Sequence, residues 1–237
     1  MIAVEQLYKR FGKNEVLKGI DLKVDQPGVY AILGPNGSGK TTLIKAILGM
    51  VIPNKGEITV NGNNVSKSPV YRQDIGYLPQ IANFPANLTV KEIIRMIQDL
   101  RNSTPDTGQL IEWFGLQPFL DKKLNTLSGG TRQKVNLVLT LMFDSPLIIL
   151  DEPTSGLDPV ALLKLKRLIR HEREAGKTIL ITSHIMSFVE EMADEIIFLL
   201  EGRIHFRGSV HALKEKTHTH DFEKAIAKTL TLNDSYV

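Results

Sequence analysis

The residues best suited to chemistry lie in one glycine-rich stretch, Gly34-Pro35-Asn36-Gly37-Ser38-Gly39-Lys40-Thr41. The stretch fits the pattern G-x-x-x-x-G-K-[ST] and lies between an expected strand and an expected helix, which disfavours an ordinary loop. Glycines let the backbone curl so that successive N–H groups face a phosphate, and a helix N-terminus adds positive potential. We therefore predict that Lys40 and the amides of Gly37 to Thr42 bind nucleotide phosphates, and that the Thr41 hydroxyl binds Mg²⁺.

An acidic pair follows an apolar run that is typical of a buried strand, Leu147-Ile148-Ile149-Leu150. Asp151 would then lie at the carboxyl edge of the sheet, where α/β folds bind ligands, and it could hold the same Mg²⁺. Glu152 alone could be a surface glutamate at a strand end. Beside a phosphate loop, we expect Glu152 to activate the attacking water as a general base.

A third motif, Leu127-Ser128-Gly129-Gly130-Thr131, predicts a helix that begins with a serine N-cap. Taken alone, it indicates only a loop that ends at a helix, although such a helix start can also bind an anion. We expect that this helix, on an insertion of the chain, does not reach the γ-phosphate at its own phosphate loop. A second subunit is therefore suggested.

With these motifs in this order, the chain resembles the ATP-binding subunit of ABC transporters over roughly residues 2–208. The family signature is LSGGQ, and Thr131 replaces its glutamine while the serine and both glycines remain. The resemblance implies an α/β fold: a P-loop NTPase, RecA-like core with an antiparallel β-subdomain and an inserted helical subdomain. It also implies a head-to-tail homodimer around two ATP molecules, in which Ser128, Gly129 and Gly130 contact the ATP of the other subunit.

The resemblance assigns roles to further residues. Gln80 corresponds to the Q-loop glutamine, which contacts Mg²⁺ and the attacking water. The D-loop, which runs along the dimer seam, corresponds to Ser155-Gly156-Leu157-Asp158. His184 corresponds to the switch histidine at the γ-phosphate, although alone it would be read as a strand-end histidine. Phe11 matches the aromatic that stacks on adenine; Tyr8 is the weaker candidate, and core packing is the alternative for both.

Composition limits the classes of protein that remain. The 237 residues are 42% hydrophobic and 23% charged, which favours a globular chain over a disordered one. The absence of cysteine excludes thiol nucleophiles and disulfides. The net charge is only +3, and the basic stretch at 164–171 reads as a solvated helix face, so we expect no nucleic-acid partner.

The pattern of apolar residues predicts alternating strands and helices with a helical insertion. Expected strands lie at 16–24, 29–33, 56–62, 75–78, 147–150 and 177–183, with a hairpin at 195–206 and helices at 43–48, 93–100 and 160–175. We expect an ATP-binding domain over 1–208, with the helical subdomain at about 83–143. Residues 209–237 would form a C-terminal helical extension with a frayed end.

The expected function is ATP hydrolysis that drives transport, of the export type. No apolar run approaches the ~20 residues that span a bilayer, and no signal peptide is visible. We therefore expect a cytoplasmic chain on the inner face of the membrane, held by separate transmembrane permease subunits that dock near Gln80. The alternative is an accessory ABC-type ATPase that assembles a membrane or metalloprotein complex, as in copper-site maturation of nitrous oxide reductase. His218 and His220 could bind a metal, but two ligands in a polar tail make a poor site.

Overall fold

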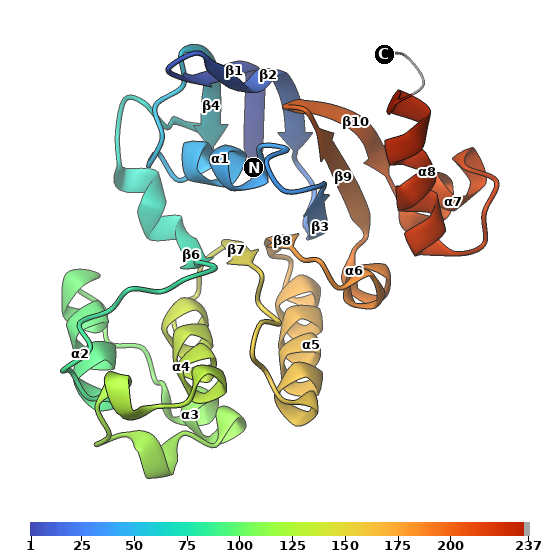
Figure 1. Cartoon of the computed structure of the whole chain (residues 1–237). Coiled ribbons are helices and arrows are strands. Elements are labelled where there is room, and N and C mark those ends of the chain that lie inside the picture. The colour runs from blue at the N-terminus through green and yellow to red at the C-terminus, as the bar shows by residue number, and fades with distance from the viewer. Residues whose placement is uncertain (235–237) are drawn as a thin grey trace. The chain divides into compact units, whose positions relative to one another are not determined.

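The protein is described by a computed structural model that covers residues 1–234 and falls into two compact units. The first unit contains Met1–Arg72 and the segment that begins at Thr178, and the second contains Gln73–Lys177. The second unit is therefore inserted in the chain of the first. The first unit is made of β1 (Ile2–Phe11), β2 (Asn14–Val24), β3 (Gly28–Leu33), α1 (Lys40–Ile47), β4 (Lys55–Val60), β5 (Asn63–Asn64), β8 (Thr178–Thr182), α6 (Met186–Met192), β9 (Glu195–Leu200), β10 (Arg203–Gly208), α7 (Val210–Lys216) and α8 (Phe222–Asp234) (Figure 1).

The central strand of the first unit is β3, and all six of its residues are buried. It pairs in parallel with β8 on one side and with β9 on the other, while β9 and β10 form an antiparallel hairpin. A continuously apolar strand is expected where both faces of a parallel sheet are covered. The expected strand at 29–33 and the expected hairpin are therefore confirmed. Because β3 and β8 are parallel, the loops that follow them leave the same edge of the sheet.

A second, antiparallel sheet of the first unit has the order β2-β1-β4-β5 (Figure 1). On its edge strand β2, Ile20, Leu22 and Val24 are buried, whereas Asp21 and Lys23 are exposed. Helix α1 packs against β2 and β4. This alternation is typical of a sheet with one buried face, as the sequence predicted, but it holds only over residues 20–24. Nearer the start of β2, Leu17 is buried and Val16 is only half-buried.

The second unit is mainly helical. It contains β6 (Ile75–Leu78), α2 (Val90–Leu100), α3 (Gly108–Phe114), α4 (Gly129–Leu141), β7 (Leu147–Asp151) and α5 (Pro159–Glu174), with β6 and β7 paired in parallel. Helix α4 contacts α2, α3 and β6, and α3 also contacts α5. The segment at 83–143 thus contains three α-helices and two short 3-10 helices, although the subdomain boundaries stay a prediction.

A complete capping box begins α2. The Glu92 N–H donates to Thr89 Oγ1 at 3.2 Å, and the Thr89 N–H donates to Glu92 Oε2 at 2.8 Å. These bonds satisfy two amides that a helix start otherwise leaves without a partner. The accepted hydrogen bonds also lower the pKa of the Glu92 carboxyl.

The C-terminal extension expected at 209–237 contains two described helices, α7 and α8. Phe222 and Ala225 of α8 are buried, and α8 contacts α6 and α7. The frayed end expected there reaches residues 235–237, which lie outside the described residues. Within residues 1–234, no helix is long and apolar enough to span a membrane.

Candidate functional site

In the phosphate loop of the first unit, Gly34, Gly37 and Gly39 all have positive φ, and two of them leave no room for a side chain. Gly34 has φ 144°, and an added Cβ would lie 2.0 Å from the carbonyl oxygen of Leu199. Gly39 has φ 107°, and its Cβ would lie 2.8 Å from a methyl of Leu17. By contrast, a Cβ at Gly37 would meet no described atom within 4 Å, so the loop has open space above this residue. The glycines therefore serve both a tight turn and an open backbone surface.

The side chains of the loop fit a phosphate ligand. Lys40 begins α1, and its Nζ donates to the carbonyl oxygens of Gly34 at 2.7 Å and Pro35 at 3.0 Å. The Ser38 hydroxyl is buried and has no hydrogen-bond partner among the described residues. Thr41 is exposed in the first turn of the helix, where backbone N–H groups lack intrahelical acceptors. A cation, an unsatisfied buried hydroxyl and open amides together make a suitable cradle for an anion.

His184 lies at the same sheet edge as this loop. Ile32 of β3 and Thr182 of β8 are register partners, and His184 follows β8 by two residues. The His184 side chain is exposed, whereas Ser183 before it is buried and its Oγ accepts from the Ile185 N–H at 3.1 Å. The first unit thus brings the phosphate loop and His184 to one edge, as expected from the parallel strands.

The two candidate aromatics differ in exposure. Phe11, the last residue of β1, is 50% exposed, and Lys9 Nζ lies 4.7 Å from the centroid of its ring. Tyr8 is half-buried, with Lys55 Nζ 5.4 Å from its ring centroid. Core packing therefore does not explain Phe11, whose ring is accessible to a flat ligand.

In the second unit, parallel pairing gathers the acidic pair and Gln80. Leu78 of β6 and Leu150 of β7 are register partners, so the residues after each strand leave the same edge. Asp151 ends β7 and is only 4% exposed, Glu152 is half-buried, and Gln80 is exposed. Oxygen ligands of this kind suit Mg²⁺.

A tyrosine that sequence analysis missed lies close to the acidic pair. Burial, with a smaller contribution from the charge of Asp151, raises the pKa of Tyr77 to about 12. Tyr77 therefore remains a neutral phenol at physiological pH. Its position on β6 was predictable from the apolar run, but its electrostatic contact with Asp151 requires the strand pairing.

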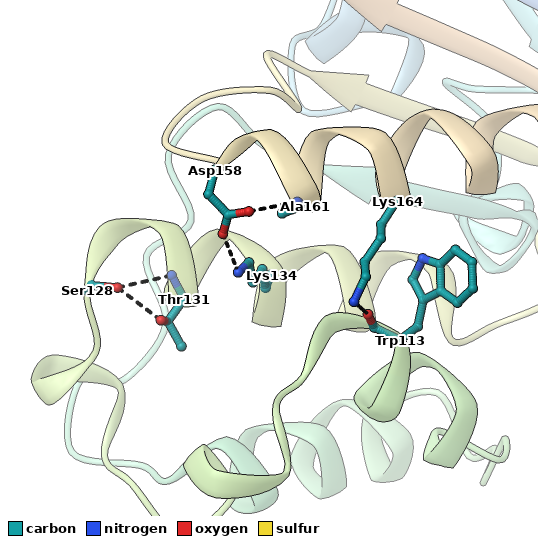
Figure 2. Close-up of polar contacts among 7 residues, drawn as sticks. All are labelled: Trp113, Ser128, Thr131, Lys134, Asp158, Ala161 and Lys164. Carbon is teal, nitrogen blue, oxygen red and sulfur yellow. Dashed lines mark hydrogen bonds and ion pairs between the residues drawn. The ribbon is translucent and has the colours of Figure 1, made fainter.

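The signature segment begins α4 as the sequence predicted. Ser128 is the N-cap, and its Oγ accepts from the Thr131 N–H at 3.3 Å. The Ser128 and Thr131 hydroxyls are also hydrogen-bonded to each other at 2.9 Å (Figure 2). Ser128 and Gly129 are exposed, which leaves this end of the helix accessible to a ligand.

Helix α4 is joined to the D-loop within the second unit. Lys134 Nζ donates to Asp158 Oδ2 at 2.6 Å, while Asp158 Oδ1 accepts from the Ala161 N–H at 2.8 Å and caps α5 (Figure 2). The Lys134 hydrogen bond and this backbone bond lower the pKa of the Asp158 carboxyl. Gln133 Nε2 also donates to the Pro153 carbonyl oxygen at 3.2 Å. Sequence analysis missed Gln133 and Lys134, because their partners lie 20 and 24 residues away.

The predicted site residues thus form two groups on different units. The first unit holds Phe11, Gly34, Pro35, Asn36, Gly37, Ser38, Gly39, Lys40, Thr41, Thr42 and His184, and the second holds Gln80, Ser128, Gly129, Gly130, Asp151, Glu152 and Asp158. Within each unit, the ends of parallel strands and the N-termini of helices position these residues.

Comparison with known proteins identifies the family. The ABC transporter family profile matches residues 17–155, and an AAA domain profile matches residues 121–190. A Nod factor export ATP-binding protein I from Rhizobium sp. (strain N33) is 35% identical over 88% of this chain and 70% of its own. A lantibiotic transport ATP-binding protein from Streptococcus pyogenes is 32% identical over 86% and 89%.

Solved structures agree with the expected fold class. The ATP-binding subunit of an ABC transporter superposes with a TM-score of 0.91 at 27% identity, covering 97% of this chain and 99% of that chain. A dimeric bacterial ABC transporter cassette gives a TM-score of 0.77 at 25% identity, covering 88% and 98%. The P-loop NTPase fold predicted from the sequence is confirmed. The chain belongs to the ABC transporter family and is an ATP-binding, ATP-hydrolysing subunit of it.

Proposed function

We propose that this chain binds and hydrolyses MgATP with the residues that the sequence singled out. The phosphate loop carries the proposal, since its open backbone at Gly37, buried Ser38 hydroxyl and Lys40 ammonium fit a polyphosphate. Phe11 would stack on the adenine, and its accessible ring supports this role. Thr41, Gln80 and Asp151 would hold Mg²⁺, which would neutralise phosphate oxygens when bound.

Hydrolysis in this proposal uses Glu152 as the general base. Its carboxylate accepts a proton from water as the water oxygen forms a bond to the γ-phosphorus. The bond from that phosphorus to the bridging oxygen breaks, and ADP leaves with the electron pair. Lys40 and the loop amides stabilise the charge on the phosphate oxygens, and His184 contacts the γ-phosphate.

The active form is proposed to be a head-to-tail homodimer. Each ATP would lie between the phosphate loop of one subunit and Ser128, Gly129 and Gly130 of the other, with Asp158 near the seam. Support comes from the solved dimeric cassette and from the exposure of the α4 N-terminus. A helix start with accessible N–H groups is suited to bind the γ-phosphate of the partner's ATP.

The proposed work of this ATPase is export through separate transmembrane subunits. The relatives named for Nod factor export and for lantibiotic transport support export. A hollow within the second unit is lined by Pro79, Phe84 and Leu100. Gln80 and Ile81 follow Pro79 in the sequence, and Ile81 is 74% exposed. An apolar helix of a permease subunit is the proposed occupant, because burying these side chains favours association.

The ATP-binding domain is proposed to span 1–208, with the extension after it.

Glu152→Gln tests the proposal directly. The variant should bind ATP but not hydrolyse it, because its phosphate contacts come from other residues. ATP-bound dimer should then accumulate and elute ahead of monomer in size-exclusion chromatography with Mg²⁺ and ATP. Glu174→Gln, an exposed change at the end of α5, is the matched control and should turn over ATP like the wild type. Wild-type turnover by Glu152→Gln would contradict the assignment of the base.

A further inference from the structure

The signature of this chain contains a pair of hydroxyls, because Thr131 replaces the family's glutamine and the serine remains. Ser128 Oγ and Thr131 Oγ1 are 2.9 Å apart, and the Thr131 N–H also donates to Ser128 Oγ at 3.3 Å. Ser128 is exposed, whereas Thr131 is half-buried one turn into α4. Figure 2 shows both interactions converging on the serine oxygen. The orientation of the Ser128 hydroxyl proton is therefore coupled to Thr131.

The hydrogen bond between the Ser128 and Thr131 hydroxyls can run in either direction. A serine hydroxyl has one proton and two lone pairs. If Thr131 donates its O–H, then both lone pairs of Ser128 Oγ accept from Thr131, and the Ser128 proton points away from the pair. If Ser128 donates instead, its own proton is used inside the pair and cannot reach a ligand.

A phosphate ligand at the helix start favours donation by Thr131, because phosphate oxygens only accept hydrogen bonds and would take the Ser128 proton. A helical threonine can otherwise donate its hydroxyl to the carbonyl three or four residues before it. Here the hydrogen bonds to those two carbonyl oxygens come from Arg132, whose Nη2 donates to Leu127 at 3.2 Å and whose N–H donates to Ser128 at 2.9 Å. Ser128 Oγ is the acceptor that the Thr131 hydroxyl contacts. An anion at the exposed side would accept the remaining Ser128 proton.

We propose that Thr131 is a positioning residue whose hydroxyl donates to Ser128 Oγ and so directs the Ser128 proton toward the phosphate of the partner's ATP. The inference rests on the proposed function, in which Ser128 contacts that ATP. Phosphate oxygens only accept hydrogen bonds, so the serine must have a proton to give. A serine oxygen that accepts two hydrogen bonds is also polarised, which strengthens the bond that it donates.

The test measures the ATP concentration that half-dimerises the protein in the Glu152→Gln background. Thr131→Val keeps the size of the side chain and a similar helix propensity but removes the hydroxyl. We expect it to require about threefold to tenfold more ATP, the value of one hydrogen bond. Thr131→Ser keeps the hydroxyl and should restore dimerisation. Thermal unfolding without ATP reports separately any general loss of stability in the three proteins.

Ser128→Ala distinguishes this inference from the proposed function. If Thr131 acts through Ser128, then Thr131→Val should have little further effect in a Ser128→Ala protein. If Thr131→Val weakens dimerisation equally with Ser128 present and with Ser128 replaced by alanine, Thr131 has a merely structural role. That result would overturn the inference. If the Thr131→Val protein dimerises like its parent while the Ser128→Ala protein is impaired, the role of Thr131 is overturned. The proposed function would then still stand. No ATP-dependent dimer in the Glu152→Gln parent, or normal dimerisation by Ser128→Ala, would reject the proposed role of Ser128 itself.

Discussion

Glu152, the proposed general base, has an uncommon backbone conformation. It has φ 53°, directly after the buried strand β7, and its carbonyl oxygen accepts from the Ser155 N–H at 3.2 Å in a tight turn. For a residue with a Cβ, the left-handed region costs roughly 1–2 kcal/mol. Such strain commonly occurs at functional sites, where surrounding structure imposes it. We therefore expect the conformation of Glu152 to lower the stability of the fold.

Paired substitutions measure this strain. Glu152→Ala and Glu152→Gly both remove the side chain, but glycine adopts a positive φ without cost. We expect Glu152→Gly to be more stable than Glu152→Ala by about 1 kcal/mol in urea unfolding. At Arg167, an exposed position inside α5, the order should reverse, because glycine is about 1 kcal/mol worse than alanine in a helix. The same order at both positions would show that Glu152 is not strained.

At the scale of elements, α4 and the D-loop contact each other through their backbones. A Cβ at Gly130 would lie 2.6 Å from the Gly156 carbonyl oxygen, which is closer than atoms can approach. Lys134 and Asp158 join the same two segments by an ion pair one turn further along α4. The second signature glycine is therefore needed for packing in its own subunit, whatever it contacts in a partner.

The two signature glycines provide a matched comparison of this contact. Gly130→Ala should destabilise the protein by about 1–3 kcal/mol, because the helix start or the D-loop must move. A Cβ added at Gly129 would have no described atom within 4 Å. Gly129→Ala should therefore be neutral or slightly stabilising, since alanine favours the helix. Urea unfolding of both variants without nucleotide measures the difference. Equal stabilities would contradict the contact.

The sequence predicted the helices and strands better than it predicted the contacts between residues far apart in the chain. Apolar runs predicted β3, β7 and β8, because buried strands need continuous hydrophobic residues. The capping box of α2 and the serine cap of α4 were likewise predictable, because each depends on residues only three positions apart. Contacts across 20 or more residues, such as the pair formed by Lys134 and Asp158, depend on packing and left no local signal. The positive φ of Glu152 also has no signature in its residue type.

At the scale of the whole molecule, the proposed mechanism needs two copies of the chain. Lys40 would bind ATP from one side, and Ser128 of the partner subunit would bind it from the other. The two residues lie on different units of the chain. The central claim is that each nucleotide site is composite, with residues from both subunits.

Mixing two defective proteins tests the composite site most directly. In the Glu152→Gln background, Lys40→Ala impairs a subunit's own phosphate loop, and Ser128→Arg blocks the signature that it offers to its partner. Each homodimer then has two defective sites. A mixed dimer has one site with both lesions and one site with neither. The reason is that the intact Lys40 of one subunit meets the intact Ser128 of the other.

The experiment measures the amount of labelled ATP bound per dimer. Light scattering confirms independently that dimers form, and thermal unfolding shows that each variant is folded. The account predicts that each variant alone binds little nucleotide in the dimer, whereas the mixture recovers one site per mixed dimer. If Ser128 served the ATP of its own subunit, every site in the mixture would carry one lesion. Mixed dimers that recover no ATP binding would contradict the account.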